Sequence, residues 1–152
     1  MVRALAGVVH REHHMIADLP IVNYLVIDGD EPYLQATVCD ACEAAYLGSR
    51  IACARCGKRT FHHRRLPSKG TVGSFTIIHR AAPSIPTPFV SVLVDLEGGT
   101  AVKANLVGCP PDPEHVSLGM AVELTTFEAA ADESGTRVVA FGFVPSDRGV
   151  TE

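Results

Sequence analysis

The stretch CDACEAAYLGSRIACARCG, residues 39–57, determines how the rest of the sequence is interpreted. It holds two Cys-x-x-Cys pairs separated by ten residues. Each pair can present two thiolates from one tight turn, and two such turns facing each other form a tetrahedral sulfur cage that suits Zn²⁺. The sequence therefore predicts a metal site whose ligands are Cys39, Cys42, Cys53 and Cys56.

The same cysteines could instead form a redox motif, disulfides or an iron site. Two pairs at this spacing are more typical of a structural metal site than of a redox motif, although the separation is shorter than the usual fifteen or so residues. Two surface disulfides, or iron in a rubredoxin-like cage, remain alternatives. A chain with five cysteines, four of them in metal spacing, fits a reducing compartment, so we expect a cytoplasmic protein.

Composition and charge narrow the functional classes. The chain has 152 residues, is 47% hydrophobic and carries a net charge of −4. Residues 36–70 have a net charge of +5, whereas residues 71–152 have a net charge of −6. An acidic C-terminal half disfavours nucleic acid as the partner. No signal peptide and no apolar run long enough to span a membrane is recognisable, so no membrane partner is expected.

The hydrophobic pattern predicts a mainly β protein in three parts. Residues 1–32 are expected to form a short, partly helical N-terminal lead-in, and Pro20 would end any helix there. Residues 33–66 are predicted to form the zinc ribbon, with a hairpin around Gly48 and Ser49 between the two cysteine pairs. Residues 67–148 are predicted to form a barrel.

Five segments of the barrel region alternate apolar and polar residues and are bounded by turn signals such as Glu97-Gly98-Gly99. We predict strands over residues 71–79, 89–96, 100–107, 121–128 and 137–144. Five short antiparallel strands in about eighty residues suit a small Greek-key barrel, most commonly an OB-fold. Alternation alone does not determine topology, so an SH3-like barrel remains an alternative.

Specific motifs in this order resemble a known family. They are the two cysteine pairs with Gly57, then GTVGSFTIIHR (70–80), PFVSVLVDLEGG (88–99), KANLVG (103–108) and the turn LGM (118–120). The chain resembles the acyl-CoA-associated proteins with a rubredoxin-like zinc ribbon and an OB-fold, formerly a domain of unknown function. One departure is Glu43, which stands where the family has glycine because the turn favours positive φ. We expect Glu43 either to strain the first turn slightly or to change its turn type, without removing a thiolate.

The resemblance implies a role in an assembly. Family members are small accessory subunits of thiolase-like enzymes, including thiolases of aromatic-compound degradation and aldolases of steroid side-chain degradation. The larger subunit holds the catalytic residues, so the resemblance implies none in this chain. It implies a structural Zn²⁺, a CoA thioester as a ligand shared with the partner, and a hetero-oligomer, for which we expect a heterotetramer.

Cationic and polar residues are the candidates for contact with CoA or the partner, because CoA carries a 3′-phosphate and a diphosphate. The candidates are Arg64, Arg65, His79, Arg80, Lys103 and Asn105. The basic segment 58–65 is interpreted either as a phosphate-binding or acidic-partner surface or as a solvated ribbon edge. The alternative function is a nucleic-acid-binding ribbon and OB-fold module. Cys109 is interpreted as a packing residue.

Overall fold

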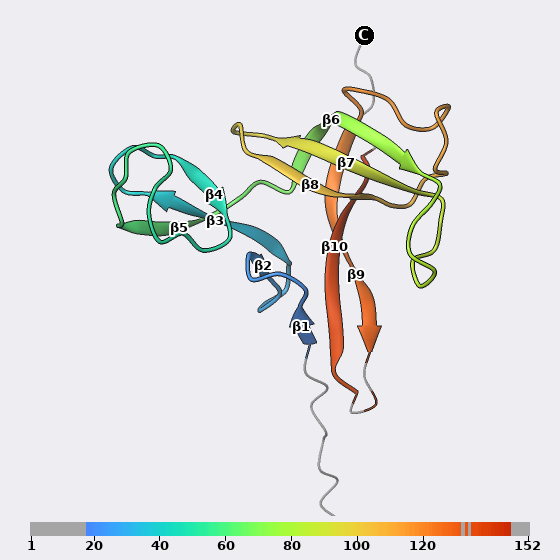
Figure 1. The fold of residues 1–152 in the computed structure, drawn as a ribbon, viewed down its shortest axis with the longest axis horizontal. Helices are drawn as coiled ribbons and strands as arrows, with labels where there is room; N and C mark the ends of the chain where they lie inside the picture. The colour runs from blue at the N-terminus through green and yellow to red at the C-terminus, as the bar shows by residue number, and fades with distance from the viewer. Residues whose placement is uncertain (1–17, 132, 134, 147–152) are drawn as a thin grey trace, which may run out of the picture.

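The fold is described from a computed structural model, which defines residues 18–131, 133 and 135–146 (Figure 1). All regular elements in these residues are strands. Within the lead-in, β1 (Asp18–Pro20) and β2 (Leu25–Val26) are short strands, and the helical expectation for residues 1–17 lies outside the described residues. No helix in the described part of the chain is long and apolar enough to cross a membrane.

Five strands form the predicted barrel. They are β6 (Lys69–Ile78), β7 (Phe89–Leu96), β8 (Ala101–Leu106), β9 (Ala121–Ala131) and β10 (Arg137–Pro145). The sheet order is β10-β8-β7-β6-β9, and β9 also pairs with β10, so the sheet closes on itself. This is the OB-fold topology and confirms the predicted fold class.

One of the pairings that close the barrel is parallel, whereas the others are antiparallel. β8 and β10 run parallel, with Leu106 opposite Phe143. A closed ring with an odd number of strands cannot alternate direction all the way round, so at least one pair must be parallel. The strand count therefore already required a parallel pair, but alternation within each strand could not show which one.

The ribbon is built on β3 (Tyr33–Cys39), which pairs with β4 (Ala45–Leu47) on one side and β5 (Phe61–Arg65) on the other. The predicted hairpin around Gly48 and Ser49 is not formed, because β4 folds back on β3 and residues 48–51 are not in a strand. The first cysteine turn itself makes the tight connection from β3 to β4. The irregular segment after Leu47 then leads to Cys53 and places the second cysteine pair next to the first.

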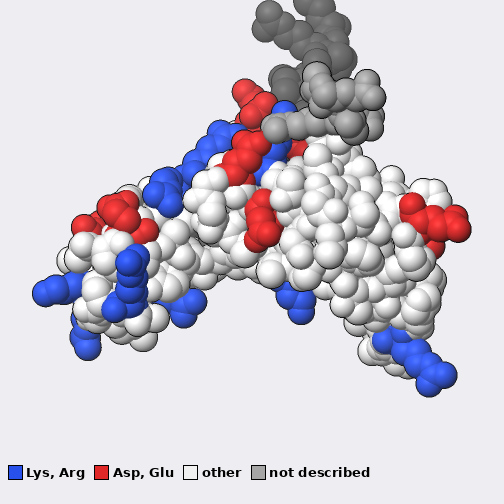
Figure 2. Space-filling view, turned by 90° about the horizontal axis from the view of Figure 1, so that it is seen from above, with Lys and Arg blue, Asp and Glu red and all other residues white. Residues whose placement is uncertain are grey.

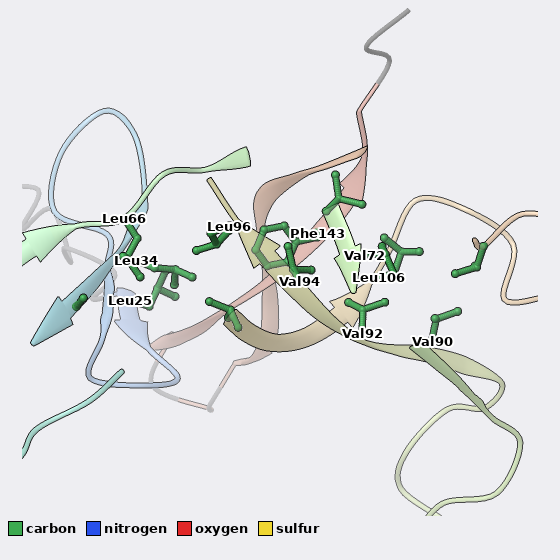
Figure 3. Close-up of a cluster of buried hydrophobic side chains, with 14 of the residues drawn as sticks. Leu25, Leu34, Leu66, Val72, Val90, Val92, Val94, Leu96, Leu106 and Phe143 are labelled. Atoms are coloured by element: carbon green, nitrogen blue, oxygen red, sulfur yellow. The ribbon is translucent and has the colours of Figure 1, made fainter. Parts of the chain in front are cut away.

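Barrel and ribbon share one hydrophobic core (Figure 3). Alternate residues of β7, from Val90 to Leu96, point inward and are buried together with Phe143 of β10. Leu25, Leu34 and Leu66 continue the same cluster on the ribbon side. A shared core of this kind fixes the ribbon against the barrel, because moving it would expose leucines from both parts.

A second contact joins the lead-in to the barrel. β1 runs parallel to β10, with Asp18 opposite Arg137. Both guanidinium contacts from Arg137 to the Asp18 carboxylate measure 2.8 Å, which is a bidentate geometry. The chain is therefore attached to the barrel both before and after the ribbon.

Candidate functional site: a four-cysteine cage on a basic ribbon

The four predicted ligands come together. The sulfur atoms of Cys39, Cys42, Cys53 and Cys56 all lie within 4.8 Å of one another. The Cys39–Cys56 and Cys42–Cys53 sulfur distances are 3.6 and 3.5 Å, and all four cysteines are free rather than disulfide-bonded. A Zn–S bond of about 2.3 Å gives a tetrahedral edge of about 3.8 Å between sulfurs. The cage therefore has the dimensions of a tetrahedral thiolate site.

The two turns that hold the sulfurs are near copies. In the first, the N–H of Glu43 donates to the carbonyl of Cys39 at 3.0 Å, and in the second the N–H of Gly57 donates to the carbonyl of Cys53 at 2.8 Å. The fifth residue of each turn has positive φ, 58° at Glu43 and 73° at Gly57. Glu43 thus adopts the conformation that glycine favours, so the turn type is retained and the strain expected from the sequence is carried by its backbone.

Ionisation of the thiols depends on neighbouring donors. The hydroxyl of Tyr46 lies 3.2 Å from the sulfur of Cys53. This bond, with the backbone N–H groups of Cys56 and Arg55, lowers the pKa of Cys53 to about 6 despite desolvation. For Cys42 the N–H of Ala44 lowers the pKa, but desolvation and the other three thiols outweigh it and raise the pKa to about 12.

The two shifts show that, without a cation, the four thiols do not ionise together. Once one sulfur in the cage is ionised, its negative charge resists ionisation of the next. A divalent cation at the centre would remove that penalty and favour four thiolates together. Distances, turn geometry and ligand type therefore fit a soft or borderline cation such as Zn²⁺. A cage closed by four sulfurs has no free coordination position for a substrate.

The six candidate contact residues do not form one cluster. Arg64 and Arg65 lie side by side on exposed β5, where Arg65 stacks over the Tyr33 ring at 4.6 Å and pairs with Glu31 at 3.4 Å. Arg64 faces Glu43 at 3.9 Å. Figure 2 shows Lys and Arg side chains gathered on the ribbon and a large uncharged surface over the barrel. Both arginines of β5 are therefore exposed, and each faces an acidic side chain of the ribbon or its lead-in.

The other four candidates lie on the barrel. His79 and Arg80 are exposed directly after β6, and Lys103 and Asn105 point outward from β8. Lys103 lines a shallow hollow of about 330 Å³ with the side chains of Ser74 and Leu93, which belong to β6 and β7. Outward faces of these central strands are where OB-folds generally bind ligands.

Arg50 was not among the contact candidates chosen from the sequence. Arg50 lies over the ring of Tyr46, 4.8 Å from its centroid, and lines a cavity between the ribbon and the β7–β8 hairpin. No spacing signal marks it, because the residues it meets lie on both sides of it in sequence and far away on the barrel. Cys109 packs against the core as predicted, and desolvation and the charge of Asp112 raise its pKa, which opposes reactivity.

Fold and site together define a protein with a four-cysteine ribbon followed by an OB-fold barrel. Residues 63–127 match the family model described as "ChsH2, C-terminal OB-fold domain". A solved structure titled "Ltp2-ChsH2(DUF35) aldolase" contains a similar chain, with a TM-score of 0.60, 29% sequence identity, and coverage of 74% of this chain and 84% of that one. The predicted resemblance to the zinc-ribbon and OB-fold family is confirmed.

A curated relative gives a further likeness. The chain is 33% identical over 92 residues to a protein of Thermomonospora curvata named "Probable enoyl-CoA hydratase alpha subunit". The match covers 60% of this chain but only 28% of the relative. The greater part of that relative has no counterpart here, so the likeness concerns one portion of a larger protein.

Proposed function

We propose that the chain is a non-catalytic accessory subunit that docks on a thiolase-like partner, an acyl-CoA thiolase or retro-aldolase, and helps to bind the acyl-CoA substrate. The observation that carries the proposal is the likeness to a chain of the Ltp2-ChsH2(DUF35) aldolase, which spans 74% of this chain. The name of the Thermomonospora curvata relative, a hydratase subunit acting on a CoA thioester, points to the same class of substrate.

The surface of the barrel supports docking. Leu93 is 41% exposed at the centre of a sheet face, where its neighbours across the strands are Ser74 of β6 and Lys103 of β8. An exposed leucine ringed by short hydroxyl side chains and one cation resembles the core and rim of a protein interface. We propose this face as the contact with the catalytic subunit, in a heterotetramer.

The cysteine cage is proposed to hold one structural Zn²⁺. When bound, the metal would supply folding free energy to the ribbon, because a ribbon this small buries little apolar surface of its own. Metal analysis of the full chain purified without chelators should give about one zinc per chain. Visible absorbance from bound iron, or a chain free of metal, would contradict this part of the proposal.

Co-expression with a thiolase-like protein tests the docking. We expect the two chains to co-elute in size exclusion and the partner's turnover of an acyl-CoA to fall when this chain is omitted. Leu93→Asp should abolish co-elution, whereas Leu118→Asp, at a leucine that is 67% exposed on the loop before β9, should leave it intact. Separate elution of the unmodified chains, or binding of a single-stranded oligonucleotide instead, would overturn the proposal.

A further inference from the structure

A cavity between the ribbon and the barrel is lined by two arginines, whereas the proposed docking face carries a single lysine. Its volume is about 440 Å³. On the ribbon side it is lined by Glu43, Tyr46, Arg50 and Arg64, and on the barrel side by the Gly98-Gly99 hairpin between β7 and β8. It is bounded by both parts of the protein, and the shared core keeps these parts in place.

Two arginines from different segments line this cavity. Arg64 comes from β5, and Arg50 follows β4 and is braced by stacking over the Tyr46 ring at 4.8 Å. Glu43 is the one acidic residue among the described residues that line the cavity, and its carboxylate is 3.9 Å from Arg64. At that distance, with both side chains exposed, the pair is weak and is easily displaced by a better anion.

The hairpin leaves the opposite wall open. Gly98 and Gly99 have φ values of +97° and +93°, a conformation that strongly favours glycine over other residues. A Cβ built at either position would meet nothing within 4 Å. Both residues line the cavity with backbone alone and add no side chain to this wall.

We propose that this ribbon–barrel cavity binds the phosphoryl groups of a small organic phosphate between Arg50 and Arg64. Guanidinium forks match phosphate oxygens in bidentate geometry, and two forks from different segments, one on β5 and one in the loop after β4, suit a diphosphate better than a carboxylate. Assigning CoA as the natural source rests on the proposed function, but the site itself needs no catalytic partner. Its ligand would reach the ribbon, not only the barrel face.

Calorimetric titration of the zinc-loaded full chain tests the site, with inorganic pyrophosphate as the first probe. We expect binding that weakens as salt concentration rises. Arg50→Gln and Arg64→Gln should each weaken it about tenfold, the effect of losing one charge-assisted contact. Glu43→Gln should tighten binding severalfold, because it removes the competing carboxylate and keeps the side-chain length.

The controls distinguish specific binding in the cavity from nonspecific attraction of the anion to the basic ribbon. Arg59→Gln removes an exposed ribbon arginine that does not line the cavity and should leave the affinity unchanged. Each variant should retain one zinc per chain, which excludes loss of the ribbon fold as the cause. In NMR spectra, the amide signals of Gly98 and Gly99 should shift on titration. Absence of pyrophosphate binding, or equal weakening by Arg59→Gln and Arg64→Gln, overturns the proposal.

A second pair of probes addresses the natural ligand. CoA should bind with the same arginine dependence as pyrophosphate, whereas pantetheine, which lacks phosphates, should not bind at this site. If pyrophosphate binds through both arginines and CoA does not, the anion site stands and its link to the proposed function fails. Failure of the co-elution experiment leaves this titration unaffected, so the two proposals can fail separately.

Discussion

The fifth residue of each cysteine turn offers the sharpest test of how the cage is built. Glu43 and Gly57 occupy equivalent positions with φ values of 58° and 73°. Replacing Glu43 by glycine or by alanine removes the same carboxylate and the same 3.9 Å contact with Arg64. The difference between the Glu43→Gly and Glu43→Ala variants therefore isolates the backbone conformation.

The magnitude follows from two opposing contributions. A residue with a Cβ at positive φ costs about 1–2 kcal/mol relative to glycine. The greater freedom of glycine in the unfolded chain offsets about 0.4–1 kcal/mol of this. We expect glycine at position 43 to be more stabilising than alanine by about 1 kcal/mol, which is about fivefold in zinc affinity, since metal binding and ribbon folding are coupled.

Competition for zinc with a chromogenic chelator measures this difference directly. Gly57→Ala should weaken zinc binding by a similar factor, because nothing lies within 4 Å of the added Cβ and the cost is conformational alone. Ala54 is exposed in the second turn and does not have positive φ, so glycine has no conformational advantage there. Ala54→Gly should therefore weaken zinc binding, whereas glycine at position 43 should strengthen it relative to alanine. If alanine at position 43 holds zinc as tightly as glycine, strain in the first turn is not a determinant of the cage.

Further outcomes concern the barrel and its loops. Phe143→Ala empties the centre of the core, where Phe143 is 0% exposed, and should lower the unfolding free energy in urea by about 3–5 kcal/mol. Gly70→Ala would place a Cβ 2.5 Å from the carbonyl oxygen of Asp95 and should cost about 1–3 kcal/mol in the same assay. His115, bonded to Asp112 at 2.7 Å, lowers the pKa of that carboxyl. The stabilisation from this pair is therefore present at neutral pH and lost as the pH falls through the depressed pKa; a carboxyl ¹³C titration should show the Asp112 pKa rising in His115→Ala.

Most of the barrel could be predicted because its strands are buried on one face. Val90, Val92 and Val94 alternate with polar or exposed residues, so period-2 patterning marks both the strand and its inward side. The cage could be predicted for a different reason: cysteine pairs imply tight turns whatever surrounds them. Both signals are local in sequence.

Partners across long separations could not be predicted in the same way. The choice of β3 rather than residues 50–51 as the partner of β4 depends on where the second cysteine turn must lie. Asp18 meets Arg137 across 119 residues, and Arg50 lines a cavity with the β7–β8 hairpin, which lies about fifty residues further along the chain. Alternation states which way a side chain faces but not which strand lies beside it.

Attachment to the barrel on both sides of the ribbon bears on how the ribbon would take up a metal ion. β1 fixes residues 18–20 on β10, and β6 returns the chain to the barrel at Lys69. A metal-free ribbon would be a loop whose two ends are held by the folded barrel. The entropic cost of bringing those ends together would therefore already be met when the barrel folds. With the barrel folded, uptake of a metal ion by the ribbon would be a local rearrangement within one molecule. Repeated loss and recovery of such an ion would not require passage through the unfolded chain.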